Sequence, residues 1–320
     1  MTTKTAIIGL GIMGRRMLEQ MLHHPAYDPV QLWDPNAENA AMALGMAPGL
    51  QLAASAEDAI AGADLVYLAC PPVPRRALAL LAAKAGKAVF LEKPLGVDIA
   101  ASSDLVQQIT STGVPAAVNF TQAAGVALTT ISNDAAAGRL GELAGIDIVV
   151  TYGAWPRAWQ QAADWLRFRE EGGMTREVIS HFLFFSERIL GPLSLVWARA
   201  SYPADSALCE THMLARLENA AGVPVSILAS VGGAQPDRQE LTIKGTAQTA
   251  RVTDFYAMST SDGGAFHAVP PSGDDPRSSS LRAQLDDLSK LVAGQPHRLA
   301  TLDEALRVQK LIEAMLQGKS

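Results

Sequence analysis

A glycine-rich hexapeptide, GLGIMG at residues 9–14, follows a short apolar run, TAII at residues 5–8. This order predicts a buried strand that turns through glycines into a helix. Such a turn presents unpaired backbone N–H groups and the positive end of a helix dipole to a pyrophosphate. Gly9 would permit the tight turn, Gly11 would leave room for the phosphates, and Gly14 would let helix and strand pack closely. The alternative is a glycine-rich turn that binds nothing, because this pattern is weak by itself.

An aspartate follows the hexapeptide at the distance expected of a ribose ligand. Asp34 lies twenty residues after the last glycine and directly follows a second apolar run, residues 30–33. A carboxylate there can accept a hydrogen bond from a ribose 2′-hydroxyl and would repel a 2′-phosphate. A loop or cap aspartate before Pro35 is the alternative. The carboxylate favours NAD over NADP. Arg15 and Arg16 at the start of the first helix could in principle reach a 2′-phosphate of NADP, but a solvated helix face is the commoner role for such residues.

Composition argues against several classes of protein. The 320 residues are 48% hydrophobic, which is enough for a substantial core. A net charge of −6 without a basic run argues against nucleic acid or an anionic membrane as the main partner. Cys70 and Cys209 form no C-x-x-C pair, which favours a reducing compartment and predicts no metal site. We see no leader and no membrane-spanning segment, so we expect a cytoplasmic protein.

The first third of the chain alternates apolar runs with alanine-rich helical stretches. The predicted strands are residues 5–8, 30–33, 51–53, 65–69, 88–91 and 116–120. The predicted helices are residues 15–22, 38–44, 56–61, 77–85 and 99–112, with Ser55 as the cap of the third. Alternation of this kind predicts right-handed crossovers and a doubly wound parallel sheet of the α/β class.

The pattern changes after residue 120. A helix is predicted over residues 126–137, followed by alternating runs that predict an open, mostly antiparallel sheet. These runs are residues 143–152, 193–200, 212–218, 225–230, 240–244 and 250–253. Further helices are expected at residues 175–190, 280–292 and 302–316, and a loop at residues 259–280. We predict a dinucleotide-binding domain at 1–120 and a second, substrate-binding and oligomerisation α/β domain at 121–320. The sequence leaves open whether the C-terminal helix packs back on the first domain.

Several chemically active residues follow the predicted parallel strands. Because ligands of such sheets bind at the carboxyl ends of the strands, Cys70, Pro71, Glu92 and Lys93 should border the same cleft as Asp34. A lysine there can hold a substrate hydroxyl and exchange its proton if its pKa falls from about 10.4 towards neutrality. An ordinary solvated lysine is the alternative.

A second group of residues lies on the predicted helix after Gly172 and Gly173. Glu177 and His181 are four residues apart and therefore neighbours on one face. A carboxylate beside an imidazole can orient it, raise its pKa and help relay a proton. The commoner alternative is a surface pair or a satisfied core histidine. A zinc site is disfavoured because no third ligand stands at a suitable spacing.

Aromatic and basic residues gather in the segment before those glycines. They are Trp155, Arg157, Trp159, Trp165, Arg167 and Arg169. Such residues can line a substrate pocket, but they are also enriched at oligomer contacts. The sequence leaves these two alternatives equal.

With these motifs in order, the chain resembles the Gfo/Idh/MocA oxidoreductase family, of the glucose-fructose oxidoreductase and inositol dehydrogenase type, over nearly its whole length. The resemblance rests on GLGIMG, on AGK and VFLEKPL at residues 85–87 and 89–95, on GRLG at 138–141, on the Gly-Gly…His helix and on TLDEAL at 301–306. It implies a Rossmann domain and a substrate-binding α/β domain that makes oligomer contacts, in a homodimer or homotetramer. It also implies hydride transfer between NAD(P) and a sugar, cyclitol or related carbinol.

The resemblance also assigns roles to individual residues. Lys93 matches the family lysine that contacts nicotinamide and substrate, His181 matches its catalytic histidine, and Glu177 stands where the family has Asp. The implied cofactor-binding residues are Gly9, Gly11, Ile12, Met13, Gly14, Asp34, Cys70, Pro71, Glu92, Lys93 and Asn119. The implied substrate-binding residues are Lys93, Trp155, Trp165, Arg167 and His181.

The chain departs from the family pattern at several positions. Ile179 replaces a glycine, Phe184 replaces an acid, an arginine is missing after Asn119, and Pro74-Arg75-Arg76 occupy the stretch of a customary histidine. These departures imply a substrate less polar than a common hexose.

We therefore predict an NAD-preferring dehydrogenase acting on a secondary alcohol of a sugar-like or cyclic polyol substrate, with Lys93 and His181 over one nicotinamide. One alternative is a non-catalytic, dinucleotide-dependent sensor on the same fold. The other is NAD-assisted elimination or glycoside cleavage.

Overall fold

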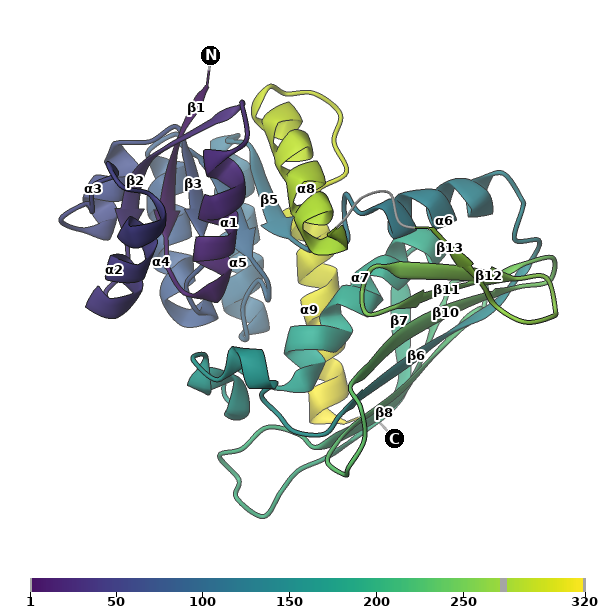
Figure 1. The fold of residues 1–320 in the computed structure, drawn as a ribbon. Helices are drawn as coiled ribbons and strands as arrows, with labels where there is room; N and C mark the ends of the chain where they lie inside the picture. Colours follow the sequence, from purple (N-terminus) through teal and green to yellow (C-terminus); the bar gives the residue numbers. More distant parts are fainter. Residues whose placement is uncertain (1, 271–274, 319–320) are drawn as a thin grey trace. The chain divides into compact units, whose positions relative to one another are not determined.

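The chain forms two compact units (Figure 1). Unit 1 comprises Met1–Phe120 and Leu281–Leu306, and unit 2 comprises Thr121–Ser280 and Arg307–Ser320. The computed structural model describes residues 2–270 and 275–318. Two helices, α8 (Pro276–Val292) and α9 (Leu302–Gln317), contribute residues to both units.

Unit 1 is built on a five-stranded parallel sheet of order β2-β1-β3-β4-β5. Its strands are β1 (Thr3–Ile8), β2 (Tyr27–Trp33), β3 (Leu65–Leu68), β4 (Ala88–Glu92) and β5 (Ala116–Asn119). Its helices include α1 (Ile12–Leu22), α2 (Ala37–Met46), α3 (Ala56–Ala61), α4 (Pro72–Lys84) and α5 (Ile99–Thr112). The predicted doubly wound sheet is confirmed. The predicted strand at residues 51–53 is wrong, since Leu52 makes only an isolated bridge to Leu32.

Unit 2 is built on an eight-stranded sheet of order β13-β12-β11-β10-β6-β9-β8-β7. Its strands are β6 (Leu143–Tyr152), β7 (Leu193–Ser201), β8 (His212–Asn219), β9 (Pro224–Val231), β10 (Arg238–Gly245), β11 (Thr249–Thr253), β12 (Ala257–Ser261) and β13 (His267–Val269). All neighbours are antiparallel except β6 and β9. The predicted open, mostly antiparallel sheet is therefore confirmed.

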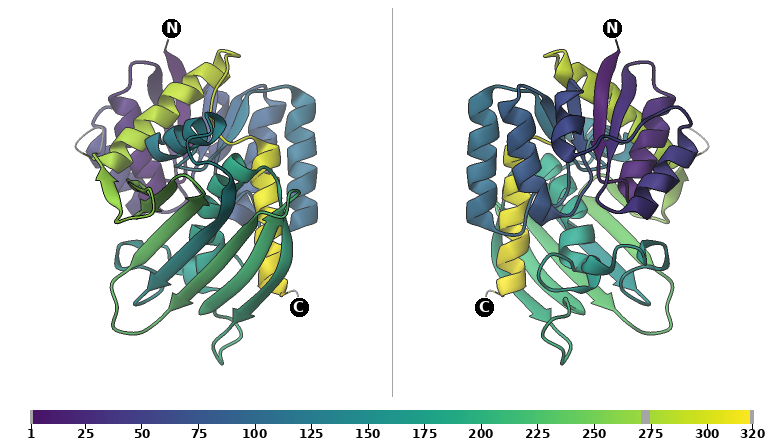
Figure 2. Two further views of the ribbon diagram at one scale, coloured as in Figure 1. Left: turned by 90° about the vertical axis from the view of Figure 1, so that its right-hand side faces the viewer. Right: turned by 90° about the vertical axis from the view of Figure 1, so that its left-hand side faces the viewer.

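Helices cover one face of this sheet. Unit 2 contains the helices α6 (Val126–Ala136) and α7 (Ser180–Leu190). Helix α7 and the C-terminal part of α9 lie on one face of the eight-stranded sheet (Figure 1). The left view of Figure 2 looks onto the opposite face. Strand β8 alternates accordingly, because Met213, Ala215 and Leu217 are buried whereas Leu214 is exposed. This period of two is what half-buried strands require.

Two predictions for unit 2 need correction. The segment predicted as a loop, 259–280, contains the end of β12, all of β13 and the start of α8, while residues 271–274 lie outside the described residues. The helix predicted over residues 175–190 is divided, because Thr175–Ile179 form a π-helix before α7 begins. π-helical turns are rare and occur frequently at functional sites.

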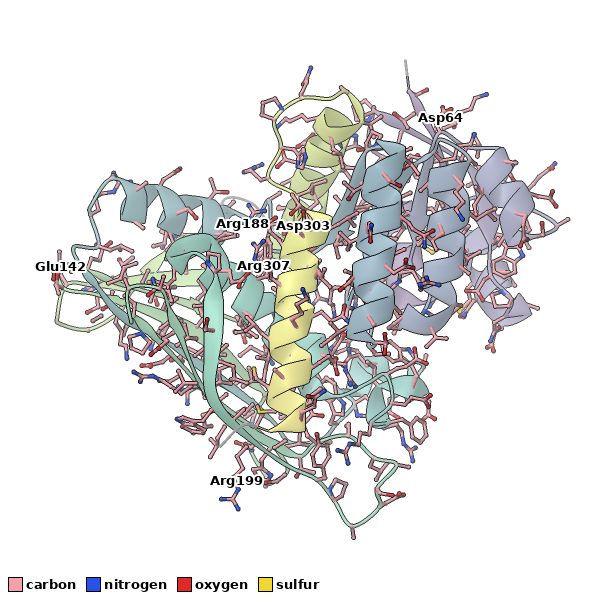
Figure 3. The ribbon with its side chains drawn as sticks, turned by 180° about the vertical axis from the view of Figure 1, so that it is seen from behind. Asp64, Glu142, Arg188, Arg199, Asp303 and Arg307 are labelled. Carbon is pink, nitrogen blue, oxygen red and sulfur yellow. The ribbon has the colours of Figure 1, made fainter. Side chains whose placement is uncertain are left out.

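Charged pairs attach the end of α9 within unit 2. Arg307, labelled in Figure 3, donates from Nε to Glu187 of α7 at 3.3 Å. Arg176 of the π-helix donates from Nε and Nη2 to the two carboxylate oxygens of Glu313, at 2.7 and 2.8 Å. This second pair is buried and bidentate, the strongest geometry for an arginine and a carboxylate.

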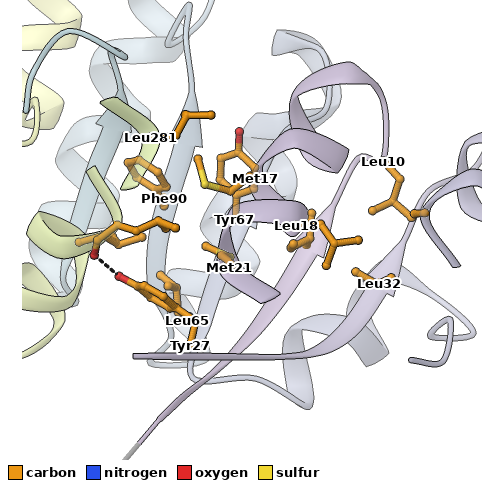
Figure 4. Packing of buried hydrophobic residues seen from close by; sticks show 14 of the residues in the cluster. Leu10, Met17, Leu18, Met21, Tyr27, Leu32, Leu65, Tyr67, Phe90 and Leu281 are labelled. Atoms are coloured by element: carbon orange, nitrogen blue, oxygen red, sulfur yellow. Dashed lines mark hydrogen bonds between the residues drawn. The ribbon is translucent and has the colours of Figure 1, made fainter. Parts of the chain in front are cut away.

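The core of unit 1 joins distant parts of the sequence (Figure 4). Met17 and Met21 of α1 and Tyr67 and Phe90 of the sheet pack in one cluster with Leu281 of α8. The phenol of Tyr27 donates to the carbonyl of Leu285, which fixes α8 in the same unit. Each fully buried leucine of this cluster contributes about 1.5–3 kcal/mol.

Polar caps mark several helix starts in unit 1. The Ser55 hydroxyl accepts a hydrogen bond from the amide of Asp58 at 3.0 Å, which confirms the predicted cap of α3. The Asn36 side chain caps α2 in the same way. At α9, Thr301 and Glu304 each accept from the other's backbone amide, which is a full capping box.

Candidate dinucleotide and acid–base site

The carboxyl ends of the unit 1 strands bring the predicted cofactor residues to one sheet edge. Gly9 follows β1, Asp34 follows β2 and Cys70 lies just after β3. Lys93 follows β4, and Asn119 is the last residue of β5. The strand order reverses between β1 and β3, and open α/β sheets bind ligands at such a switch point.

The glycine turn has the shape that a pyrophosphate requires. Gly9 has φ +91°, and a Cβ there would lie 2.6 Å from the nitrogen of Cys70. A Cβ on Gly14 would lie 1.9 Å from the Gly9 carbonyl oxygen, so helix and strand approach too closely for any side chain. A Cβ on Gly11 would meet nothing within 4 Å. That open space adjoins the first turn of α1, which starts with Ile12 and Met13 and has no side-chain cap among the described residues. The turn therefore fits a dinucleotide phosphate.

Asp34 is held against the glycine turn. Its Oδ2 accepts from the amide of Leu10 at 2.6 Å and its Oδ1 from the amide of Asn36 at 2.8 Å. Arg15 donates to the Leu10 carbonyl at 2.6 Å and to Asn39 Oδ1 at 3.3 Å. Asn39 Nδ2 also donates to Asp34 Oδ2, at 3.4 Å. The guanidinium of Arg15 is thus engaged by the turn itself, and Asp34 Oδ1, which accepts from the Asn36 amide, retains further acceptor capacity.

Glu92, the residue before Lys93, belongs to a buried polar network on one face of the sheet. Glu92 accepts hydrogen bonds at Oε1 from the phenol of Tyr67 and from Asn119 Nδ2, the latter at 2.6 Å. Burial raises the pKa of Glu92, while the Tyr67 hydrogen bond and the Lys93 charge act in the opposite direction. Lys93 itself is half-buried, and its peptide bond to Pro94 is cis.

Arg75 is a further buried cation at this edge, with only 2% of its surface exposed. It lies in the first turn of α4 and donates to the carbonyls of Cys70, Glu92 and Pro94. Burial lowers the pKa of Arg75, although nearby Cys70 and Glu92 act to raise it.

In unit 2, the predicted acid–base residues lie across the junction of the π-helix and α7. Glu177 belongs to the π-helix and His181 is the second residue of α7. The ring of His181 is buried and packs edge-on against Phe255, with ring centroids 5.7 Å apart. The carboxylate Oε1 of Glu177 accepts from Gln160 Nε2 at 3.0 Å and lies 3.9 Å from Arg157 Nη2.

The segment of tryptophans and arginines folds around Arg157. This buried guanidinium lies over the ring of Trp159, at 4.7 Å from its centroid, and near Tyr152 and Trp155 at 5.3 and 5.8 Å. Its Nε donates to Gln160 at 2.7 Å. Trp155 is therefore joined through Arg157 to Glu177.

Other predicted site residues are less engaged. Arg167 is exposed and pairs with Asp164 at 3.2 Å, and Trp165 is half-buried beside it on a 3-10 turn. Pro71 is exposed at the start of α4. The catalytic and binding roles assigned to all these residues stay predictions.

Sequence reasoning passed over three residues of these networks. Tyr67 lies in an apolar run and is not distinguished from its neighbours there, and Gln160 belongs to no recognisable motif. Arg75 registers only as a departure from a family pattern. Strand register provides a usable signal for Tyr67. Tyr67 pairs with Phe90 of the neighbouring strand, and Glu92 lies two residues after Phe90, so the side chains of Tyr67 and Glu92 are on the same face of the sheet.

Among residues 2–270 and 275–318, no three His, Cys, Asp or Glu side chains are grouped so that they could hold a metal ion. Of the helices in the same ranges, none combines the length and apolar character needed to cross a bilayer.

Two family models match the chain. Residues 3–120 match the oxidoreductase family model of Gfo/Idh/MocA type, described as an NAD-binding Rossmann fold. Residues 130–251 match the model of the Gfo/Idh/MocA C-terminal domain.

Individual relatives agree with these matches. An inositol 2-dehydrogenase of Cereibacter sphaeroides is 35% identical over 111 residues, which is 33% of this chain and 33% of that protein. The structure of the WlbA dehydrogenase from Bordetella pertussis, with NADH and UDP-GlcNAcA, superimposes with a TM-score of 0.83 and 21% identity, covering 99% of this chain and 96% of the other. A UDP-N-acetylglucosamine 3-dehydrogenase from Acidithiobacillus ferrooxidans gives 0.81 and 18%, covering 99% and 97%. The match to the inositol dehydrogenases spans about a third of their length.

Proposed function

Because the chain belongs to the Gfo/Idh/MocA family of oxidoreductases, we propose that it is a dehydrogenase that oxidises a secondary alcohol of a cyclic polyol or sugar with NAD⁺, or reduces the matching ketone. The observation that carries the proposal is the common edge of the unit 1 sheet. There the glycine turn, Asp34 and Lys93 follow three of its five parallel strands.

Asp34 and the glycine turn support NAD as the cofactor. The open space at Gly11 and the start of α1 would take the pyrophosphate, and Asp34 would accept from a ribose hydroxyl. A carboxylate held by the Leu10 amide at 2.6 Å would repel a 2′-phosphate. Arg15, one of the two candidate cations, already donates to the Leu10 carbonyl.

Lys93 supports the acid–base half of the reaction. When bound, NAD⁺ supplies the hydride acceptor. As the alcohol is oxidised, its hydroxyl proton must leave, and the amine of Lys93 takes that proton. General base help of this kind is worth about 10²–10⁴ in rate. His181 of unit 2 remains the second predicted acid–base residue, and Glu177 the residue predicted to orient it.

Relatives and the tryptophan segment support the substrate class. Two relatives are inositol 2-dehydrogenases, which motivates cyclic polyols as the first class to test. Aromatic rings such as Trp155 and Trp159, with a fixed guanidinium from Arg157, form the type of surface on which sugar-like rings bind.

The test compares Lys93→Met with Lys87→Met as a matched control. Lys87 directly precedes β4, at the opposite end of the same strand, and donates to the Ala61 carbonyl at 3.3 Å. We expect Lys93→Met to lose about 10²-fold or more in turnover with a polyol panel. Its NADH affinity, measured by fluorescence titration, should stay near the wild-type value, and Lys87→Met should behave as wild type.

The alternatives give different results in the same assays. Cofactor affinity and turnover lost together in Lys93→Met would contradict the acid–base role. NADH binding without reduction of NAD⁺ by any polyol would favour a dinucleotide-dependent sensor. Tightly retained NAD⁺ with substrate conversion but no net NADH would favour redox-assisted elimination.

A further inference from the structure

We infer that Arg75 is a positioning residue that fixes the backbone of Lys93 at the edge of the unit 1 sheet. The inference rests on the proposed function of Lys93. Arg75 would act away from the reacting atoms, through hydrogen bonds to three main-chain carbonyls.

The geometry joins both sides of Lys93 to one guanidinium. Arg75 Nη1 donates to the carbonyl of Glu92 and to that of Pro94, the residues immediately before and after Lys93. The Cα of Lys93 is therefore held between two main-chain hydrogen bonds to one side chain. Few other side chains could do this, because the guanidinium carries five donors in a rigid, planar arrangement.

The same guanidinium also ties Lys93 to the end of β3. Its Nε and Nη2 both donate to the carbonyl of Cys70, at 3.0 and 2.5 Å. Cys70 in turn lies against Gly9, where a Cβ would approach its nitrogen to 2.6 Å. Arg75 thus connects the segment Glu92–Pro94, which contains Lys93, to the glycine turn that is proposed to hold the cofactor.

Burial makes this arrangement demanding. Arg75 is 2% exposed, and Glu92, whose main-chain carbonyl accepts from it, is 5% exposed. Removing the guanidinium would leave three carbonyls without their donor at a site from which water is largely excluded. Such carbonyls gain by moving, so the loop that bears Lys93 would shift.

The adjacent arginine provides a control. Arg76 lies on the same helix, but its side chain is 41% exposed and pairs with Asp104 of α5. It also donates to the Ala101 carbonyl at 3.4 Å. Arg76→Met removes an arginine from the same turn of α4 without touching the Lys93 loop.

The experiment compares Arg75→Met, Arg75→Lys and Arg76→Met in the full chain. Five quantities are measured: polyol turnover with its KM, NADH affinity, the pH profile of turnover, the thermal unfolding midpoint, and the rate at which acetic anhydride acetylates Lys93, followed by peptide mass spectrometry. The acetylation rate reports on Lys93 whether or not a substrate is found.

We expect Arg75→Met to lose about 10²-fold in turnover with little change in NADH affinity, because a shift of about 1 Å is enough for such a loss. The acidic limb of its pH profile and the acetylation rate of Lys93 should both change. Arg75→Lys should be intermediate, since one ammonium cannot reproduce the fork. Arg76→Met should match wild type.

Two results would overturn the inference. One is the same turnover and the same Lys93 acetylation in Arg75→Met and Arg76→Met. The other is a parallel loss of NADH binding and of thermal stability in both Arg75 variants, which would show that Arg75 stabilises the fold as a whole. If no polyol reduces NAD⁺ in the wild type, the proposed function fails, while acetylation of Lys93 still decides the role of Arg75.

Discussion

The amide of Leu10 donates to Asp34 Oδ2 at 2.6 Å, so the carboxylate proposed to hold the ribose also fixes the glycine turn proposed to hold the pyrophosphate. One side chain would therefore serve both halves of the proposed dinucleotide site. This coupling predicts that cofactor affinity depends on Asp34 in two ways, through the ribose and through the shape of the turn.

Replacing Asp34 should weaken NADH binding more than NADPH binding. A hydrogen bond to a charged group is worth about 1.5–3 kcal/mol, so Asp34→Ala should lose at least tenfold in NADH affinity. NADPH affinity should fall less, because loss of the turn contact weakens binding of both cofactors whereas loss of the repelling charge favours NADPH alone. Asp64→Ala is the control, since Asp64 accepts from the Lys4 amide at 3.3 Å at the amino end of the same sheet. Equal losses for both cofactors would show that Asp34 acts only on the turn.

The two cysteines should differ in their response to cofactor. Burial raises the pKa of the Cys70 thiol, and raises that of Cys209 to about 12. Both should be poor nucleophiles at pH 8, but Cys70 is half-buried beside Gly9 whereas Cys209 is buried in unit 2. We expect slow alkylation of Cys70 that NAD⁺ slows further, and reaction of Cys209 only after unfolding. Mass spectrometry of iodoacetamide-treated protein measures both rates. An unchanged Cys70 rate at saturating NAD⁺ would contradict the proposed cofactor edge.

A buried aspartate should make unit 1 sensitive to acid. Burial acts to raise the pKa of Asp287, but hydrogen bonds from Arg298 and Lys290, each at 2.7 Å, outweigh it and leave the pKa below its ordinary value. A depressed folded-state pKa stabilises the protein above the unfolded pKa, and this stability disappears as pH falls through the folded pKa.

Asp287→Asn should therefore cost about 1.5–3 kcal/mol near neutral pH and progressively less as the solution is acidified below about pH 4. Urea unfolding at a series of pH values measures this difference. Asp286→Asn is the control, because the neighbouring Asp286 side chain is 64% exposed. A stability loss for Asp287→Asn that does not vary with pH would contradict the electrostatic explanation.

The uncovered sheet face of unit 2 predicts self-association. Leu214 of β8 and Leu228 of β9 face one another across the strands and are 43% and 48% exposed, and Trp197 of β7 is 42% exposed. An apolar row on an open sheet favours a partner, and we propose a second copy of the chain. Leu228→Lys should shift the assembly to a smaller species in light scattering, whereas Val126→Lys on α6, an apolar residue that is 59% exposed, should not. A wild-type monomer at high concentration would contradict this proposal.

Periodicity and glycine punctuation were sufficient to predict most of the fold. Strands β1 to β5 are short apolar runs bounded by turns, so local sequence determines them. The run at residues 51–53 fails because it pairs only at Leu52. Strand β12 was missed because three of its five residues are serine or threonine, as in a loop. Strand β13 was missed because it is only three residues long.

The site was only partly predictable. Gly9, Asp34 and Lys93 follow strands whose carboxyl ends must share an edge, so a parallel sheet brings them together from any sequence with this order. Arg75 was not predictable in the same way, because its partners are main-chain carbonyls that leave no trace in the sequence. The attachment of Glu177 to Gln160 and Arg157 depends likewise on how an irregular segment folds.

Transfer of deuterium from carbon-deuterated polyols to NAD⁺ tests the central claim most directly. The protein is mixed with NAD⁺ and a panel of cyclic polyols and sugars carrying deuterium at their carbinol carbons, and the nicotinamide is analysed by mass spectrometry. The proposal predicts singly deuterated NADH with at least one polyol, and loss of that product in Lys93→Met while NADH still binds. Conversion of a polyol without deuterium in the nicotinamide, or no labelled cofactor from any polyol in the panel, would contradict it.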